Sequence, residues 1–252
     1  MWGSDRENRD TIPRAYYQGS CEKFLSASEA EIYHELVHNS LQFDLTVQQE
    51  KAWNEEVRIV KDVMFQLQEG YITFEYSIPR MGKRIDAVLV IRSCVILLEF
   101  KVFETAYPKN AVDQVIDYAL DLHNFHESSH TANLFPILVC TGAPVHVNQI
   151  SMVNGISSPI LCCENTLTDE IQHIIHDHDN GVAIDPSQWI NSMYKPTPTI
   201  IEAAQALYSG HNVQEISYKE SDDNDIAVTT AQIDKIIEDS KKNHWKSICF
   251  VT

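Results

Sequence analysis

The amino-acid sequence predicts an α/β fold in which helices flank both faces of a mixed central sheet. The expected elements follow the order helix, three strands, helix and strand, which is typical of this class. Segments 85–91 and 94–102 are apolar at nearly every position, as expected of central strands that are covered on both faces. With 252 residues, 44% of them hydrophobic, the chain is long enough to enclose one large core.

The first expected elements are helical. Residues 1–26 are mainly polar and predict an N-terminal arm. Ser28 and Glu31 have the spacing of a capping box, so a helix is expected to begin there. Apolar residues recur at helical spacing over 47–67, and Gly70 ends this second helix.

The next part of the chain is rich in strands. An aromatic and β-branched segment predicts a strand over 71–78, ahead of the two apolar strands. The elements expected after these three strands are a helix over 111–125, strands over 134–140 and 159–163, and a helix over 167–176.

The composition changes near residue 191, where prolines appear and the acidic segment ESDDND follows. We therefore expect a core domain over 27–190 and a connector over 191–252. Within the connector, the sequence predicts helices near 200–208 and 230–241 and a final apolar strand, SICFVT, over 247–252.

Charge and composition argue against several classes of protein. The net charge of −17 does not suit a general nucleic-acid coat protein. Residues 80–109, however, carry six basic and three acidic side chains, which is either a local binding site or ordinary fluctuation. No apolar run reaches the roughly 18–20 residues of a membrane helix, and the polar start is not a signal peptide. The six cysteines form no CxxC pair, so reduced thiols and a cytoplasmic location are expected.

Two acidic residues are brought together if the two apolar strands form a hairpin that turns at Arg92-Ser93. Asp86 then stands directly opposite Glu99, with the two Cβ atoms about 4.5–5.5 Å apart on one face of the sheet. Lys101 follows Glu99 by two residues and shares that face. Arg-Ser is not a typical tight-turn sequence, so the register depends on the symmetry of the two strands.

Opposed carboxylates inside a sheet need a proton, a cationic partner or a metal ion. Oxygen ligands at this spacing suit Mg²⁺ or Mn²⁺, and a neighbouring lysine suits metal-dependent phosphodiester cleavage. The alternative is a structural triad in which Lys101 neutralises one of the acids. On the next helix, Gln114 and Tyr118 lie four residues apart and share a face, where they either line the same cleft or form a polar shoulder beside the core.

The pattern D…ExK across a hairpin, followed by QxxxY on a helix, resembles the PD-(D/E)XK nuclease superfamily. This resemblance implies a restriction-endonuclease-like αβββαβ core. The segments IPRMGKRIDAVLV, LLEFKV and DQVIDYALDLHNFH are similar to the N-terminal nuclease-like domain of bacterial Schlafen group-3-like DNA/RNA helicase proteins. The resemblance extends from about residue 14 to the end of the chain.

The resemblance also implies roles for individual residues. The implied catalytic residues are Asp86, Glu99, Lys101, Gln114 and Tyr118. The implied ligands of Mg²⁺, or of Mn²⁺ in its place, are Asp86, Glu99 and the backbone carbonyl of Phe100, with Glu56 on the first core helix as a further candidate. The basic residues expected to contact nucleic acid are Arg80, Lys83 and Arg84.

The expected function is therefore that of a Mg²⁺-dependent nuclease, an endonuclease in the superfamily's manner, that hydrolyses phosphodiester bonds in DNA or RNA. The alternatives are a catalytically silent nuclease-like module that binds nucleic acid or a partner, and a general scaffold with a buried ion triad. The resemblance implies a helicase partner in the same or a longer chain and a host-defence role. The lack of a long apolar run predicts no membrane association, and a homo-oligomer is a further possibility. The sequence contains no GxxxxGK[ST] phosphate loop, so no ATPase activity is expected in this chain, and SICFVT reads as the lead-in to an absent motor domain.

Overall fold

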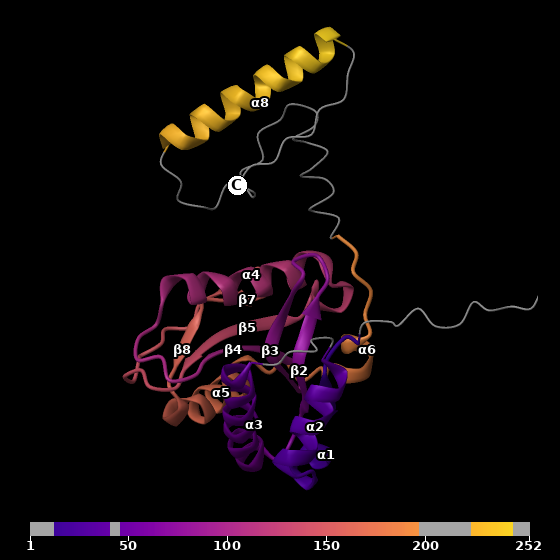
Figure 1. Ribbon diagram of the computed structural model, residues 1–252, viewed down its shortest axis with the longest axis vertical. Coiled ribbons are helices and arrows are strands. Elements are labelled where there is room, and N and C mark those ends of the chain that lie inside the picture. Colours follow the sequence, from indigo (N-terminus) through magenta and orange to yellow (C-terminus); the bar gives the residue numbers. More distant parts are fainter. Residues whose placement is uncertain (1–12, 41–45, 197–222, 244–252) are drawn as a thin grey trace, which may run out of the picture. The chain divides into compact units, whose positions relative to one another are not determined.

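The computed structural model describes residues 13–40, 46–196 and 223–243, and it divides the chain into two units, 1–197 and 198–252. The first unit is an α/β structure built on a mixed eight-stranded sheet (Figure 1). Its strands follow the spatial order β1-β2-β3-β4-β5-β7-β6, and β8 also pairs with β5. Strands β1, β2, β3 and β4 pair antiparallel in succession, whereas β4, β7 and β8 each run parallel to β5.

The strands are β1 (Tyr17–Ser20), β2 (Tyr71–Ile78), β3 (Lys83–Ile91), β4 (Cys94–Lys101), β5 (Asn133–Cys140), β6 (Met152–Val153), β7 (Ile156–Ser157) and β8 (Ile160–Cys162). The helices of the first unit are α1 (Cys21–Ser26), α2 (Glu29–Asn39), α3 (Val47–Leu67), α4 (Lys109–Phe125), the 3₁₀ turn η1 (Glu127–Ser129), α5 (Glu164–His178) and α6 (Pro186–Ile190). In the second unit the structure describes α8 (Asp223–Asn243).

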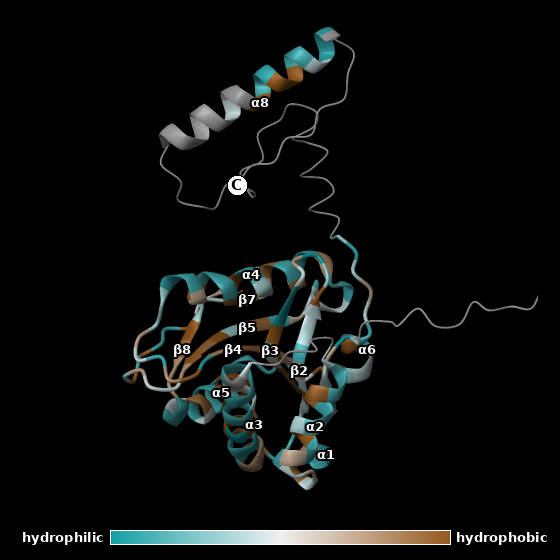
Figure 2. Cartoon of the chain, in the orientation of Figure 1, coloured by the Kyte–Doolittle hydropathy of each residue, from teal (hydrophilic) through white to brown (hydrophobic). Residues whose placement is uncertain are grey.

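The sheet separates two apolar cores, one on each face. Helices α2, α3 and α5 cover one face through residues such as Leu36, Val60 and Ile171. Helix α4 covers the other face, where Val115 and Leu122 pack on the strands (Figure 1). Figure 2 shows hydrophobic residues concentrated in the central strands and hydrophilic residues over the helices. This is the burial expected of central strands with amphipathic helices on both sides.

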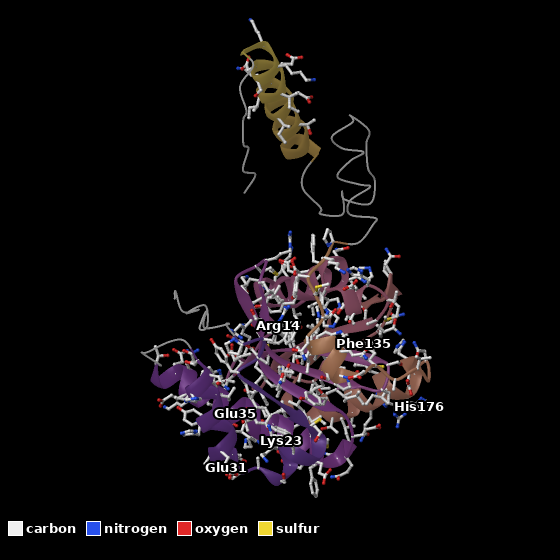
Figure 3. The ribbon with its side chains drawn as sticks, turned by 90° about the vertical axis from the view of Figure 1, so that its right-hand side faces the viewer. Arg14, Lys23, Glu31, Glu35, Phe135 and His176 are labelled. Atoms are coloured by element: carbon white, nitrogen blue, oxygen red, sulfur yellow. The ribbon has the colours of Figure 1, made fainter. Side chains whose placement is uncertain are left out.

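The helices follow the local signals in the sequence. Helix α3 spans the 21 residues that the apolar spacing predicts. Helix α2 begins after a complete capping box, in which Ser28 accepts from the Glu31 backbone N–H and Glu31 accepts from the Ser28 backbone N–H. Side chains fill the space between the layers, with Phe135 inside and His176 at the surface (Figure 3).

Strand β1 shortens the predicted arm. Residues 17–26 form β1 and α1 instead, and β1 pairs with β2 at one edge of the sheet. Tyr17 is buried against Phe24 and Phe74, at ring-centroid distances of 5.8 and 6.2 Å. A four-residue strand with alternating burial is too short to stand out in a polar segment, and it forms because Tyr17 can enter the core.

Helix α6 completes the core domain expected over 27–190, and its Trp189 is buried. At the start of the expected connector, Tyr194 forms a β-bridge with His126, so this residue also packs on the first unit. In the second unit, α8 includes the helix predicted over 230–241 and is longer than expected. The helix predicted over 200–208 and the SICFVT segment lie outside the described residues.

Two further absences concern the part of the chain that the structure describes. None of its helices has both the length and the apolar character needed to cross a lipid bilayer. Its five cysteines are buried and unpaired, so no disulfide contributes to the fold there.

Candidate active site

The β3–β4 hairpin has the predicted register. Its paired residues run from Ile91 and Cys94 beside the turn to Ala87 and Leu98. One more step in this register sets Asp86 opposite Glu99. Arg92 adopts a positive φ of 52° in the tight turn. This conformation is unusual for arginine, so the sequence does not predict it.

The end of β3 is tied to β4 through a side chain. Asp86 Oδ2 accepts a hydrogen bond of 2.7 Å from the backbone N–H of Phe100, on the neighbouring strand. The carboxylate thus takes a donor at the point where the regular pairing of the two strands stops. This contact holds Asp86 beside Glu99.

A polar network surrounds Glu99. Its Oε1 atom accepts hydrogen bonds from Lys101 Nζ at 2.6 Å and from Gln114 Nε2 at 2.9 Å. Gln114 Nε2 also donates to the Tyr118 hydroxyl oxygen at 2.6 Å. The other oxygen of Glu99, Oε2, is buried and has no hydrogen-bond partner among the described residues. The structure therefore brings together the four side chains of the ExK and QxxxY patterns.

Helix α3 contributes a further acid from the opposite side of the sheet. Glu56 is only 5% exposed, whereas the adjacent Glu55 forms a 2.6 Å ion pair with Arg58. Glu56 interacts electrostatically with Glu99 and Lys101, so it belongs to the same group of charges. Its inward direction follows from its position between the core residues Trp53 and Val60.

Glu75 on β2 is a fourth acid, which the sequence reading did not identify. Its neighbours Phe74 and Tyr76 pair with Ala87 and Ile85 of β3, so Glu75 lies opposite Asp86. Its φ is +55°, an unusual value for a residue with a side chain, and the strand changes faces there: Phe74 packs in one core and Tyr76 in the other.

The Glu75 carboxylate is held by the first core helix. Trp53 Nε1 donates to Glu75 Oε1 at 2.7 Å. Nothing in the segment YITFEYSI marks this residue, because a glutamate in an alternating strand usually faces water. The signal that was missed is tertiary: a positive φ that turns the residue toward the site.

The crowding of carboxylates perturbs their ionisation. Burial, followed by the charge of Glu99, raises the pKa of Asp86 well above its ordinary value. Burial, followed by neighbouring carboxylates, also raises the pKa of Glu56. The pKa of Glu75 is raised mainly by burial, although the hydrogen bond from Trp53 opposes the shift. The pKa of Glu99 is raised by burial too, against the opposing effect of Lys101. A buried cation would remove this conflict.

Lys101 remains the cation of the group. Burial alone would lower the pKa of its ammonium, but the Glu99 and Asp86 carboxylates more than offset that effect, so the pKa is raised. Lys101 is therefore a hydrogen-bond donor and a fixed positive charge, and not a ready proton acceptor.

A cavity of about 490 Å³ lies beside these residues. Its lining comes from the residue before β1, the C-cap of α2, α3, β2, β3, the turn between those two strands, and α4: Tyr16, Ser40, Gln49, Trp53, Glu75, Gly82, Lys83, Arg84, Gln114 and Tyr118. Gln114 links this cavity to the carboxylates, because it also donates to Glu99.

The three predicted nucleic-acid contacts have different surroundings. Lys83 lines the cavity and is exposed. Arg84 also lines it, but its guanidinium donates to the carbonyl oxygens of Glu75 and Pro13. The structure does not bring Arg80 into this group.

Arg80 and Arg84 are held by tertiary contacts. Arg80 Nε donates to Asp121 at 3.0 Å, and its guanidinium lies 3.6 Å from the centroid of the Phe125 ring on α4. The Arg84 guanidinium lies 3.9 Å from the centroid of the Tyr16 ring. Two of the three basic residues expected to contact nucleic acid, Arg80 and Arg84, are therefore already engaged by residues distant in the sequence.

The carboxylates of this site are of the chemical type that binds a hard divalent cation. Carboxylate oxygens are the donors that Mg²⁺ and Mn²⁺ prefer, and Glu99 Oε2 is a buried acceptor without a partner among the described residues. Within the same part of the chain, no group of three or more His, Cys, Asp or Glu side chains is drawn into a metal-binding arrangement. Lys101 compensates the Glu99 carboxylate, and a bound cation would favour the ionised forms of the remaining acids.

Comparisons of the chain with protein-family models, with curated proteins and with solved structures give no match, so the description of this site stands on its own geometry.

Proposed function

We propose that this chain is a metal-dependent nuclease that hydrolyses phosphodiester bonds in DNA or RNA, on a restriction-endonuclease-like αβββαβ core. The order α3, β2, β3, β4, α4 and β5 corresponds to that core. The observation that carries the proposal is the grouping of Asp86, Glu99 and Lys101 with the Gln114–Tyr118 pair at one end of the sheet.

Each residue has a role that its contacts support. Asp86 and Glu99 provide carboxylate oxygens toward one region, and Glu99 keeps one oxygen without a partner among the described residues. Lys101 presents a positive charge that stabilises the charge developing on a phosphate in the transition state. Gln114 holds Glu99 Oε1, and its bond to the Tyr118 oxygen leaves the Tyr118 hydroxyl proton available for donation.

The ligands of a divalent cation would be Asp86 and Glu99, together with the Phe100 carbonyl and Glu56. When bound, such a cation supplies Lewis-acid stabilisation of the phosphate and favours water as a nucleophile. Lys101, which donates to Glu99 Oε1, would orient the phosphate and neutralise its charge.

The test is cleavage of end-labelled single- and double-stranded DNA and RNA in Mg²⁺, in Mn²⁺ or in EDTA. We expect cleavage with either metal, none in EDTA, and at least a hundredfold loss in Asp86→Asn. The matched control is Asp113→Asn, which removes the charge of an exposed residue of α4. Equal cleavage by Asp86→Asn and wild type, or cleavage in EDTA, would contradict the proposal.

A second function has its own supporting observation. Lys101 already forms a 2.6 Å ion pair with Glu99, as expected of a structural triad in a nuclease-like module that binds nucleic acid or a partner without cutting it. The net charge of −17 also favours a restricted binding surface. Nucleic-acid binding without cleavage in any metal would favour this second function. In both cases the partner we propose is a helicase or ATPase domain, in the same or a longer chain.

A further inference from the structure

We infer that the cavity lined by Glu75, Lys83 and Gln114 binds one nucleotide of a single-stranded nucleic acid next to the carboxylates. This inference rests on the proposed nuclease function and narrows its substrate class. It also gives Trp53, which lines the same cavity, a use as a direct reporter of binding.

The size of the cavity limits what can enter it. Its volume of about 490 Å³ falls within the range of about 300–1,000 Å³ that is typical of small-molecule pockets. A B-form duplex is much too wide to enter, since its major groove alone is about 12 Å across. One nucleotide, unstacked from its neighbours, is the part of a nucleic acid that such a cavity can enclose.

The lining is polar in a way that suits a nucleotide. The Gln49 amide offers a donor and an acceptor, and Gln114 offers its carbonyl oxygen, because its Nε2 already donates to Glu99 and Tyr118. Such amide groups are among those that read the edges of unstacked bases. Glu75 offers a carboxylate oxygen to a sugar hydroxyl or a base amino group. Lys83 lines the cavity, is exposed and acts electrostatically on Glu99, so its ammonium can contact a phosphate beside the carboxylates.

The aromatic residues of the cavity provide walls and not stacking platforms. Tyr16, Trp53 and Tyr118 are at most 7% exposed, so their ring faces are already covered. Recognition in this cavity therefore depends on hydrogen bonds and on the Lys83 charge.

The position of the cavity connects binding to cleavage. Gln114 lines the cavity and donates to Glu99 Oε1 at 2.9 Å. Glu75 lines it and lies opposite Asp86 across β2 and β3. A nucleotide seated in the cavity thus brings an adjoining phosphate to the acids and to Lys101.

The first experiment uses Trp53 as a reporter. Its indole N–H is bonded to Glu75, so a ligand that reaches Glu75 changes the surroundings of the indole. The chain is titrated in EDTA with 5′-phosphorylated dinucleotides of thymidine and of uridine, which separate DNA from RNA. We expect a saturable change in tryptophan fluorescence with at least one of them. Trp53→Phe should abolish that change, and circular dichroism checks its fold.

The second experiment measures affinity without depending on Trp53. Fluorescence anisotropy in EDTA compares labelled single-stranded 12-mers with the corresponding duplex, and the single strand should bind at least tenfold more tightly. Lys83→Met should weaken single-strand binding about fivefold and reduce the salt dependence by about 0.7, the contribution of one phosphate contact. The control is Lys23→Met, which removes the same charge from the exposed surface of α1 (Figure 3).

Three results would overturn the inference: no fluorescence change in the wild-type chain, duplex binding as tight as single-strand binding, or equal effects of Lys83→Met and Lys23→Met. The nuclease proposal is judged separately by cleavage in Mg²⁺ or Mn²⁺. Cleavage confined to duplexes would leave that proposal intact and overturn the cavity assignment. Single-strand binding that depends on Lys83, without cleavage in either metal, would support the cavity assignment and contradict the nuclease.

Discussion

At the scale of single residues, Lys101 shows how one partner decides the state of a buried group. Its side chain is 33% exposed, and its Nζ atom lies 2.6 Å from Glu99 Oε1. Burial disfavours the ammonium, but the adjacent carboxylates favour it more strongly, so the pKa is raised. The lysine is therefore held in the fold as a positive charge and a hydrogen-bond donor.

Lys101→Met should abolish metal-dependent cleavage, with a loss of at least a hundredfold, because it removes the charge and keeps much of the stem. The far-ultraviolet circular dichroism spectrum should be unchanged, since the side chain is not part of either core. Lys195→Met, which removes an exposed ammonium paired with Glu127, is the matched control. Cleavage by Lys101→Met at the wild-type rate would exclude Lys101 from the reaction.

His126 is a second residue whose protonation state is set by its surroundings. It is fully buried, its Nδ1 lies 2.7 Å from Ser129 Oγ, and its Nε2 lies 3.3 Å from the Tyr76 hydroxyl. Burial, with a smaller effect from Arg14, lowers the pKa of His126 to about 4. The folded protein thus holds this imidazole neutral.

This shift predicts that acid weakens the fold. Below pH 6.5 the unfolded chain binds a proton at His126 that the folded protein does not bind until about pH 4, so stability falls as the pH is lowered through this window. The expected loss from this group is about 2 kcal/mol between pH 7 and pH 5. Denaturant unfolding at both pH values measures it, and His126→Gln should lose less stability on acidification. Equal losses in variant and wild type would show that His126 is not responsible.

At the scale of elements, β1 depends on one aromatic side chain. Tyr17 enters the core between Phe24 and Phe74 and anchors an edge strand of only four residues. Its hydroxyl oxygen is buried and has no hydrogen-bond partner among the described residues. The ring and the hydroxyl therefore affect stability in opposite directions.

Substitutions at Tyr17 separate these two effects. Tyr17→Ala should cost about 3–5 kcal/mol, because it leaves a large cavity in the core. Tyr17→Phe should be neutral or slightly stabilising, because it removes a buried polar group that is not satisfied in the native fold. Urea unfolding of both variants tests this pair. A marked loss of stability in Tyr17→Phe would mean that the hydroxyl has a partner in solution.

At the scale of the whole molecule, the segment after α5 belongs to the first unit. Trp189 is buried and its indole Nε1 donates to Ser129 at 3.0 Å. The Lys195 backbone N–H donates to the Phe125 carbonyl. These contacts extend the first unit to the boundary between Thr197 and Pro198.

Two truncations test this boundary. A chain that ends at Thr197 should fold and should unfold at a temperature within about 3 °C of the full chain, because no core residue is lost. A chain that ends at Asp185 should be destabilised by about 3–5 kcal/mol, since it loses Trp189 and leaves a cavity. Calorimetry measures both. Equal stability of the two truncated chains would show that α6 contributes nothing to the fold.

The sequence by itself determined those features that depend on short-range spacing. The two apolar strands and their turn define the register that sets Asp86 opposite Glu99. Helical periodicity defines α3 and directs Glu56 inward. Such features are predictable because the periods of strands and helices decide which side chains share a face.

Only the tertiary structure decided which charged residues belong to the site. Glu75 joins it through a positive φ and a hydrogen bond from Trp53, 22 residues away in the chain. Arg80 donates to Asp121 and does not join the site. Arg84 donates to the Glu75 carbonyl and lies over the Tyr16 ring. The physical reason is that the strength of a charge depends on its desolvation and on its partners, and both arise only when distant segments pack together.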